Sequence, residues 1–303
     1  MSTQTAPLTL DRQAQSKRKV RWDLLPYWLL LPSLLLIGLV NLYPFFTAVN
    51  YSLTDGTMLV NGKFIGLQNY VRLFQQADFL HSLWFSLIFA LFGVFGSYLV
   101  GLGFALILNQ DIPGRGFLRV ALLVPWIIPS IVSMVSWRWM ISDQTGPINL
   151  LITSLGFAPI YFLSTERLAI FSVIVVKIWR SFPFMMLSLL AGLQTIDREI
   201  YEAAEIDGAG RWQSFRYMTM PHLFNLSVVL WILMTIWSVN DFDTPYLLTG
   251  GGPSNATENL IILAHRYTFR RNDVGMGTAT AFVTLLILLS LALGLLRRQR
   301  QTN

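Results

Sequence analysis

Four charged side chains lie inside or at the ends of long apolar stretches of this chain: Lys177, Arg180, Asp241 and Asp243. A charge among apolar residues is costly unless it is paired or functional, so these residues are the first candidates for chemistry. Lys177 and Arg180 are three residues apart and would share one face of a helix. Such groups favour ion pairing, or hydrogen bonding to the hydroxyls of a polar solute.

Motifs for bond-breaking chemistry are missing from the sequence. Gly62-Lys63 is followed by Phe64, so there is no phosphate-binding G-x-x-x-x-G-K-[ST] loop, and H-E-x-x-H, G-x-S-x-G and paired-carboxylate patterns are also absent. The chain has no cysteine, and His81, His222 and His265 are scattered too widely to suggest a metal site. We predict no catalytic residue, no metal ligand and no cofactor bound by this chain.

The composition is that of a membrane protein. Of the 303 residues, 54% are apolar and 13% are charged, whereas about a quarter are charged in a soluble domain. The net charge of +6 could indicate a nucleic-acid partner in a soluble protein, but in a membrane protein it more often reflects cytoplasmic loops. We predict an all-α, polytopic protein in contact with lipid, and no nucleic-acid partner.

Apolar stretches long enough to cross a bilayer recur along the chain. One of them is interrupted by Lys177 and Arg180. We predict a permease domain over 24–296, with a tail at each end over 1–23 and 297–303. Its six predicted spans lie near these residues: 25–48, 82–108, 118–139, 168–192, 222–244 and 274–296.

Basic residues predict the orientation of these spans. If both termini are cytoplasmic, the inner segments hold 13 of the 22 Lys and Arg residues and the outer segments hold six. Because cytoplasmic loops carry an excess of Lys and Arg, we expect both termini on the cytoplasmic side of the cell membrane.

A row of small residues indicates how two of the spans pack. Gly93, Ser97, Gly101 and Ala105 recur at every fourth position, which is typical of a helix face that closely approaches another helix.

The predicted inner loop over 197–221 is too long, and its residue pattern too regular, for a simple turn. We expect a short helix from Arg198 to Ile206, a break at Gly208, and a second short helix that Pro221 ends. The pair could dock another protein or rest on lipid headgroups. The acidic first half favours a protein partner, because headgroups attract Lys and Arg.

This loop resembles the coupling loop of ABC importer permeases. Glu202-Ala203-Ala204, three residues, Gly208, nine residues and Met218-Thr219-Met220-Pro221 follow the family pattern E-A-A, three residues, G, nine residues, I-x-L-P. Met218 and Met220 replace the usual Ile and Leu but remain large and apolar. The resemblance implies a coupling helix that sits on a cytoplasmic ATPase subunit through these residues: Glu202, Ala203, Ala204, Asp207 and Gly208.

The resemblance covers about residues 25–296 and is strongest to the carbohydrate-uptake branch, which includes maltose and glycerol-phosphate permeases. Three segments carry it: 43–45, 179–186 and the glycine-rich 247–253, where family members approach the sugar-binding protein. The resemblance implies that these residues contact the sugar: Arg180, Ser181, Phe184, Ser238, Asn240 and Asp241. The polar groups would bind hydroxyls, and Phe184 would cover the apolar face of a pyranose.

Structural roles for the same charges stay open at this point. Arg180 and Asp241 could form an ion pair, which would disfavour a strongly anionic substrate, or Asp241 and Asp243 could lie in outer water. Lys177 could pair with a carboxylate of a partner permease.

The resemblance thus implies one membrane subunit of an ATP-driven ABC importer for a carbohydrate or polyol, such as a trehalose-like or maltose-like sugar or a glucoside. Its expected partners are a second homologous permease, two ATPase subunits that bind ATP and Mg²⁺, and an external sugar-binding protein. A secondary transporter driven by an ion gradient is the alternative, but it predicts carboxylates buried at mid-membrane, which the six spans lack. A membrane scaffold without transport would leave Lys177 and Arg180 unexplained.

Overall fold

The computed structural model describes residues 25–60 and 62–302, and its contacts divide the chain into two units after Thr47. The predicted N-terminal tail lies outside the described residues. α1 (Leu25–Ile37) continues through the π-helical turn η1 (Gly38–Leu42) into α2 (Tyr43–Ser52), so the division falls within α2. Together they provide a span from Tyr27 to Ser52.

The polytopic all-α fold is confirmed. Across the described residues, the extended structure is limited to one isolated bridge between Thr54 and Phe64. Besides the first span, four helical segments are long and apolar enough to cross a membrane: Ala77–Leu108, Glu166–Leu193, Arg211–Val239 and Val274–Gly294. These correspond to α4 (Ala77–Leu108), α8 (Glu166–Leu193), the α10–η2–α11 segment and α14 (Val274–Thr302). The predicted C-terminal tail is therefore helical as far as Thr302.

The predicted span over 118–139 is not one straight helix. It consists of α5 (Arg115–Ile127) and α6 (Ser130–Met140), which meet at an angle of 91°. Pro129 is the cause, because its ring forces the preceding Ile128 into an extended conformation with ψ of 132° and removes one backbone donor. Apolarity continues across the bend, so hydropathy predicted one span where the chain turns.

The second unit is built on the pairing of α4 with α8. The predicted small-residue face lies at this contact: a Cβ atom on Gly101 would lie 2.7 Å from Met185 Cβ and 2.8 Å from Met186 N. Ser97 and Ala105 are fully buried. Close approach of the two backbones therefore depends on small side chains along α4.

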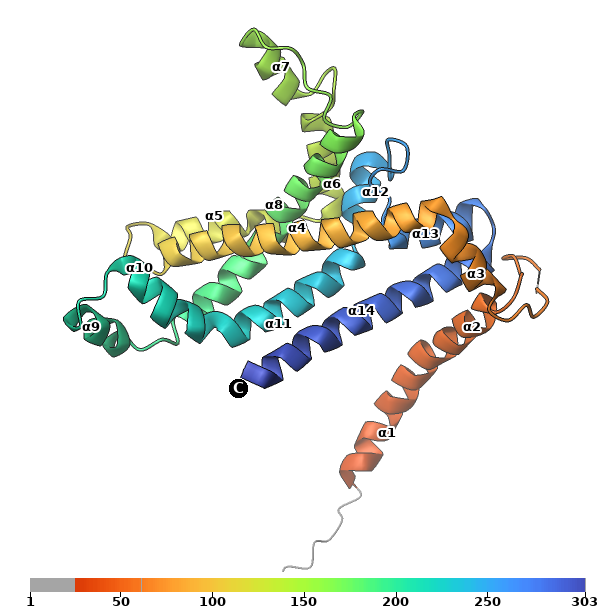
Figure 1. The fold of residues 1–303 in the computed structure, drawn as a ribbon, viewed down its shortest axis with the longest axis horizontal. Helices are drawn as coiled ribbons and strands as arrows, with labels where there is room; N and C mark the ends of the chain where they lie inside the picture. The colour runs from red at the N-terminus through yellow and green to blue at the C-terminus, as the bar shows by residue number, and fades with distance from the viewer. Residues whose placement is uncertain (1–24, 61, 303) are drawn as a thin grey trace, which may run out of the picture. The chain divides into compact units, whose positions relative to one another are not determined.

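Shorter elements close the two ends of the second unit. In Figure 1, α4, α11 (Met220–Val239) and α14 lie along roughly the same axis, with α11 antiparallel to α4; α12 (Asp243–Thr249) and α13 (Leu260–His265) are at one end and α9 (Arg198–Ile206) and α10 (Arg211–Ser214) at the other. The remaining short segments are α3 (Gln68–Gln75), α7 (Pro147–Ser154) and the π-helical turns η2 (Phe215–Thr219) and η3 (Arg266–Arg270). We call the two ends of the second unit the α12–α13 end and the α9–α10 end.

The prediction that Pro221 ends a second short helix is wrong. α10, η2 and α11 form one helical segment from Arg211 to Val239, and Pro221 lies in its interior. The π-helical turn η2 comes directly before this proline and widens the helix, which relieves the clash between the proline ring and a carbonyl of the preceding turn. The first short helix and the break at Gly208, with φ of +83°, are as predicted.

Gly101 provides a test of the α4–α8 contact. Gly101→Leu should destabilise the protein by about 1–3 kcal/mol, because the added side chain would have to displace α8. Gly103→Leu is the matched control: Gly103 is exposed on the same helix and a Cβ there meets nothing within 4 Å. Unfolding in detergent measures both variants, and equal stability of the two would contradict the packing role of the small-residue face.

Candidate functional site

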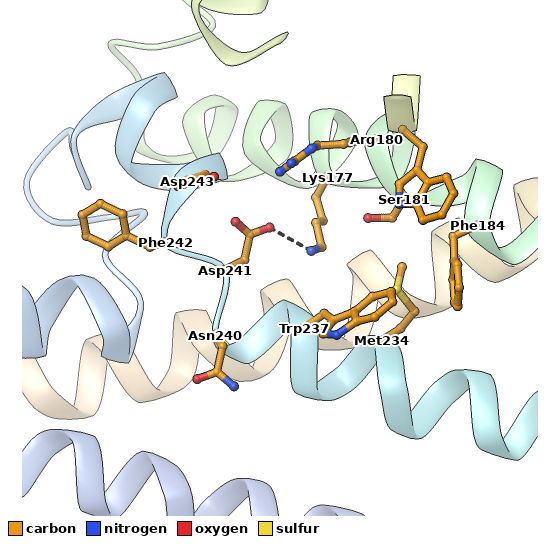
Figure 2. A pocket seen from close by; sticks show the side chains of 11 residues that line it. Lys177, Arg180, Ser181, Phe184, Met234, Trp237, Asn240, Asp241, Phe242 and Asp243 are labelled. Atoms are coloured by element: carbon orange, nitrogen blue, oxygen red, sulfur yellow. Dashed lines mark hydrogen bonds and ion pairs between the residues drawn. The ribbon is translucent and has the colours of Figure 1, made fainter. Parts of the chain in front are cut away.

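A cavity of about 400 Å³ lies where α8 meets the end of α11 and the start of α12 (Figure 2). It contains both cations and both carboxylates that stand out in the sequence, together with several aromatic rings. Its lining residues are Trp126, Lys177, Arg180, Ser181, Phe184, Met234, Trp237, Asn240, Asp241, Phe242 and Asp243.

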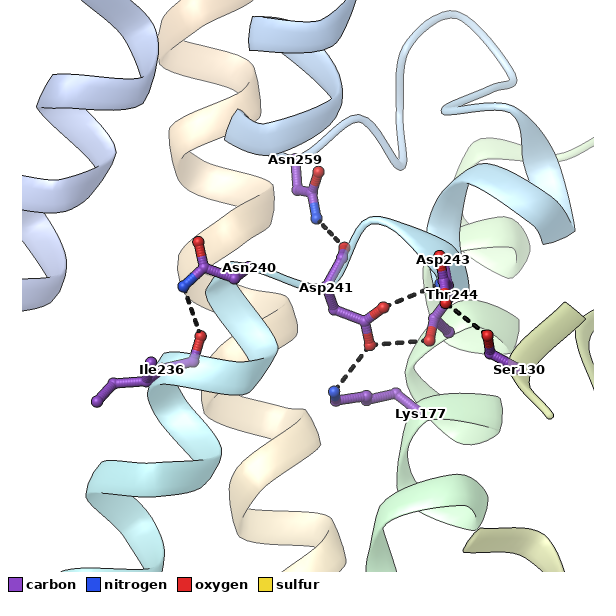
Figure 3. Close-up of polar contacts among 8 residues, drawn as sticks. All are labelled: Ser130, Lys177, Ile236, Asn240, Asp241, Asp243, Thr244 and Asn259. Atoms are coloured by element: carbon purple, nitrogen blue, oxygen red, sulfur yellow. Dashed lines mark hydrogen bonds and ion pairs between the residues drawn. The ribbon is translucent and has the colours of Figure 1, made fainter. Parts of the chain in front are cut away.

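A buried ion pair forms one wall of this cavity. Lys177 Nζ lies 2.8 Å from Asp241 Oδ2, and the side chains are only 6% and 7% exposed (Figures 2 and 3). The alternative that Arg180 pairs with Asp241 is therefore wrong, and so is the alternative that Lys177 pairs with a carboxylate of another subunit. A pair buried this deeply requires both partners, because either charge alone would be left without compensation.

The path of the lysine side chain explains why it reaches Asp241. Lys177 Cγ would lie 3.1 Å from a Cβ atom on Gly93, so the missing side chain of α4 leaves room for the lysine stem. Lys177 Nζ also lies 5.8 Å from the centre of the Phe89 ring, within range of a cation–π interaction. Helix α4 thus directs Lys177 toward the end of α11.

Asp241 connects three helical elements. Its carboxylate accepts hydrogen bonds from Lys177 of α8 and from the backbone N–H and the hydroxyl of Thr244 in α12, at 3.0 and 2.8 Å from the latter two. Its backbone carbonyl accepts a bond of 2.6 Å from Asn259 Nδ2, and Asn259 caps the start of α13 (Figure 3). The main role of this carboxylate is therefore to hold the junction between α11 and α12, because its oxygen atoms are bonded to Lys177 and Thr244.

Arg180 is the cation left available for a ligand. It is half-buried, and within the described residues it makes no hydrogen bond or ion pair. Asp243, the second carboxylate, accepts a 2.6 Å hydrogen bond from Ser130, the first residue of α6. A guanidinium with free donors in a partly enclosed cavity is suited to bind hydroxyl or anionic oxygen atoms.

Three aromatic rings line the cavity near Arg180. The Phe184 ring centre lies 5.8 Å from that of Trp126 and 5.0 Å from that of Trp237. The three rings come from α5, α8 and α11, so the surface exists only when these helices are assembled. Their faces provide an apolar surface for a flat ligand.

The cavity brings together five of the six residues predicted to contact a solute: Arg180, Ser181, Phe184, Asn240 and Asp241. Ser238 is not among the lining residues. It is fully buried, and its Oγ lies 3.9 Å from the position of a Cβ atom on Gly93. Ser238 directly follows Trp237 in α11, so its side chain points about 100° around the helix from that of Trp237.

Sequence reasoning left several lining residues out of the predicted site. Trp237 is four residues before Asp241, so helical spacing could have found it. Trp126 is brought to the cavity by the packing of α5 against α8, and no local sequence signal indicated this. Phe242 and Asp243 flank the predicted Asp241 directly.

The predicted coupling residues form an exposed knuckle at the α9–α10 end. Glu202, Ala203, Asp207 and Gly208 are exposed, whereas Ala204 is only 4% exposed. We define the knuckle as residues 198–212; it also exposes two large apolar side chains, Ile206 at 87% and Trp212 at 71%. The Tyr201 hydroxyl lies 2.9 Å from Thr219 Oγ1, which joins α9 to η2.

The predicted glycine-rich turn lies at the opposite, α12–α13 end. Gly250 and Gly251 end α12 with φ of +68° and +89°, values that favour glycine. The side chain of Thr257 then holds the turn together, with its hydroxyl 2.6 Å from Thr249 Oγ1 and 2.9 Å from the Gly252 carbonyl.

Next to this turn is a cluster of charged side chains. Arg266 lies 2.7 Å from Asp78 and 2.9 Å from Glu258, and Arg271 lies 3.3 Å from Asp78. Glu258 is almost fully buried, and its Oε2 has no hydrogen bond with suitable geometry among the described residues. Burial therefore outweighs the attraction of Arg266 and raises the pKa of Glu258 to about 7.

Comparison with known proteins identifies the family. Residues 97–299 match the family described as "Binding-protein-dependent transport system inner membrane component". The chain belongs to this family. The permease is therefore a multi-pass membrane transport subunit of the ABC importer class. The family match and the relatives favour this class over the alternative of an ion-driven transporter.

Two relatives are similar over almost their whole length. The permease is 37% identical over 282 residues to the trehalose/maltose transport system permease protein MalF of Thermococcus litoralis, covering 93% of this chain and 95% of the relative. It is 35% identical over 281 residues to the sulfoquinovosyl glycerol transport system permease protein SmoG of Agrobacterium fabrum, covering 89% and 90%.

A solved structure shares the fold. A chain of a bacterial alginate ABC transporter, solved in complex with an alginate pentasaccharide-bound periplasmic protein, is similar with a TM-score of 0.81 over 92% of the permease and 95% of that chain. The two sequences are 21% identical, so this likeness concerns the arrangement of the helices.

The buried ion pair can be tested by a double-mutant comparison. Lys177→Met and Asp241→Asn should each lower the free energy of unfolding by about 3–5 kcal/mol, because each removes the partner of a buried charge. The double variant should be less destabilised than the sum of the two. Arg115→Ala is the control, since its ion pair with Asp111 is exposed and is worth about 1 kcal/mol or less. Strict additivity of the two substitutions in detergent unfolding would exclude the pairing.

Proposed function

We propose that the permease moves a carbohydrate or polyol across the membrane, and that the cavity at Arg180 is where this solute binds. The supporting observation is the combination of an unpaired guanidinium with three neighbouring aromatic rings in one cavity of about 400 Å³. Sugars present both hydroxyl groups and apolar ring faces, and such a cavity offers a partner for each. The transport systems of the two relatives are named for sugars or a sugar glycoside.

The residues have separate roles in this proposal. Arg180 and Ser181 donate hydrogen bonds to hydroxyl groups, and Asn240 adds an amide at the exposed edge of the cavity. Phe184, between Trp126 and Trp237, covers the apolar face of the sugar ring. Asp241 is a positioning residue, because its oxygens are already occupied by Lys177 and Thr244.

The charge of the solute is less restricted than the sequence suggested. An Arg180–Asp241 pair would have disfavoured an anionic sugar, but Asp241 is paired with Lys177. Arg180 is therefore free to bind a hydroxyl or an acidic group. We favour a trehalose-like or maltose-like sugar or a glucoside, with acidic sugars compatible with the same arginine.

The partners follow from the importer class. We propose that the permease pairs with a second homologous permease, that two ATPase subunits carrying ATP and Mg²⁺ dock on the cytoplasmic side, and that an external solute-binding protein delivers the sugar. The exposed knuckle around Glu202 and Gly208 is the proposed ATPase contact, with Ile206 and Trp212 as its apolar anchors. Both termini are then cytoplasmic, in agreement with the excess of Lys and Arg on that side.

Arg180 tests the proposed solute site. Arg180→Ala should reduce uptake of trehalose, maltose or sulfoquinovosyl glycerol, whichever the wild-type complex imports, about tenfold or more, because charged hydrogen bonds are lost. The measurement is uptake into vesicles containing the permease, its second permease, its ATPases and its binding protein. Arg138→Ala is the control, since Arg138 is an exposed arginine outside the cavity. Normal uptake by assembled Arg180→Ala complexes would remove Arg180 from the site.

Gly208 tests the proposed ATPase contact. Gly208→Ala should uncouple ATP hydrolysis from transport, because alanine is strained at φ of +83° and the knuckle would change shape. Gly210→Ala is the matched control: its φ is −73°, and an added Cβ would lie an ordinary 3.7 Å from Gln213 Oε1. The ratio of sugar imported to ATP hydrolysed should fall for the first variant and stay unchanged for the second. An unchanged ratio for both would contradict the coupling role.

A further inference from the structure

A second group of aromatic rings lies beside the solute cavity, at the α12–α13 end. Phe242 and Tyr246 are stacked with ring centres 4.4 Å apart, and His265 lies 5.1 and 5.6 Å from these two rings. Phe269 extends the group, with its ring 4.9 Å from that of His265. We call Phe242, Tyr246, His265 and Phe269 the outer aromatic cluster. The sequence assigned no role to any of them.

Three of these rings line a groove of their own. Phe242, His265 and Phe269 form one side of an open groove of about 360 Å³, and its floor includes the small residues Gly277, Thr278 and Ala281 of α14. The floor is tightly packed, since a Cβ atom on Gly277 would lie 3.0 Å from the Ala264 carbonyl. Phe269 is 65% exposed, so the outer part of the groove is open.

Phe242 belongs to both spaces. It lines this groove and also the solute cavity. In Figure 2 its ring lies on the opposite side of Asp241 from Phe184 and Trp237. Phe242 therefore connects the outer groove with the solute cavity, next to the Lys177–Asp241 pair.

The chemistry of the groove suits a ligand with apolar ring faces and hydroxyl groups. Its lining residues include neither a carboxylate nor a lysine or arginine. Beyond the lining residues, Arg270 donates a 3.3 Å hydrogen bond to the hydroxyl of Tyr246, whose ring lies 5.6 Å from that of His265. Aromatic faces next to a hydroxyl and a guanidinium group suit a sugar ring, whether the sugar is neutral or acidic.

We propose that the outer aromatic cluster is a second carbohydrate subsite, from which the sugar passes over Phe242 into the cavity at Arg180. This inference rests on the proposed function, because it places the outer subsite on the path to the proposed solute site. The outer subsite would bind different sugars with little selectivity, before the sugar makes polar contacts with Arg180. A sugar released at this end would meet the outer aromatic cluster first and then Phe242 before it reaches Arg180.

The test compares aromatic with aliphatic side chains of similar size. Phe269→Leu and His265→Leu keep an apolar side chain but remove the ring, whereas Phe269→Tyr and His265→Phe keep a ring. Phe157→Leu is the control, because Phe157 is 68% exposed and lines neither cavity. The assay measures uptake of trehalose, maltose and sulfoquinovosyl glycerol, together with ATP hydrolysis, by the full complex in lipid vesicles with its binding protein.

A subsite on the path predicts a specific change. The two leucine variants should import about three- to tenfold less sugar per ATP hydrolysed, while ATP hydrolysis stimulated by the binding protein is retained, and the two aromatic variants should restore the ratio. The control should match the wild type.

Three results would overturn the inference. They are an unchanged ratio in the leucine variants, a parallel loss of uptake and ATP hydrolysis, which indicates a docking face or a lipid anchor, and failure of the aromatic variants to restore the ratio. If Arg180→Ala complexes import the sugar normally, the proposed solute site itself fails, so the two failures are distinguishable.

Discussion

The ion pair between Lys177 and Asp241 is the interaction on which the rest of the site depends. It joins α8 to the end of α11, and the same carboxylate holds the first turn of α12 through Thr244. Because the pair is almost completely buried, neither residue can be replaced alone without leaving a bare charge. The pair also consumes both charges, so Arg180 is the cation that remains for a ligand. A structural ion pair thus decides which residue is left for binding.

That pair in turn depends on an absent side chain. Gly93 gives the lysine stem its path across α4, and Gly101 lets the same two helices approach further along. The small-residue face of α4 therefore does more than allow close packing. It sets the separation at which a lysine of α8 reaches a carboxylate beyond the end of α11. Backbone packing and the electrostatics of the site are consequences of one pattern of residues.

Much of this arrangement could be predicted from the sequence, for physical reasons that differ from residue to residue. Spans were predictable because hydrophobic length is a local property, and the break at Gly208 because positive φ favours glycine. Arg180 and Asp241 stood out because charges in apolar stretches are rare. Pairing was not predictable: Lys177 and Arg180 share a helix face, and the choice between them depends on the neighbouring helix. Trp126 and the outer aromatic cluster were missed because contacts between elements, of α5 with α8 and of α12 with α13, bring them into place.

The continuous helix from Arg211 to Val239 connects the knuckle, which is the proposed ATPase contact, with the solute cavity. Its 29 residues span about 43 Å at 1.5 Å per residue. One end carries Trp212 of the knuckle, and the other ends two residues before Asp241. Had Pro221 ended a helix, motion at the knuckle would have been absorbed in a loop. The π-helical turn η2 keeps the helix continuous past the proline. If the knuckle is the ATPase contact, as proposed, we expect its displacement to reach the Asp241 junction, where Lys177 and Phe242 both lie.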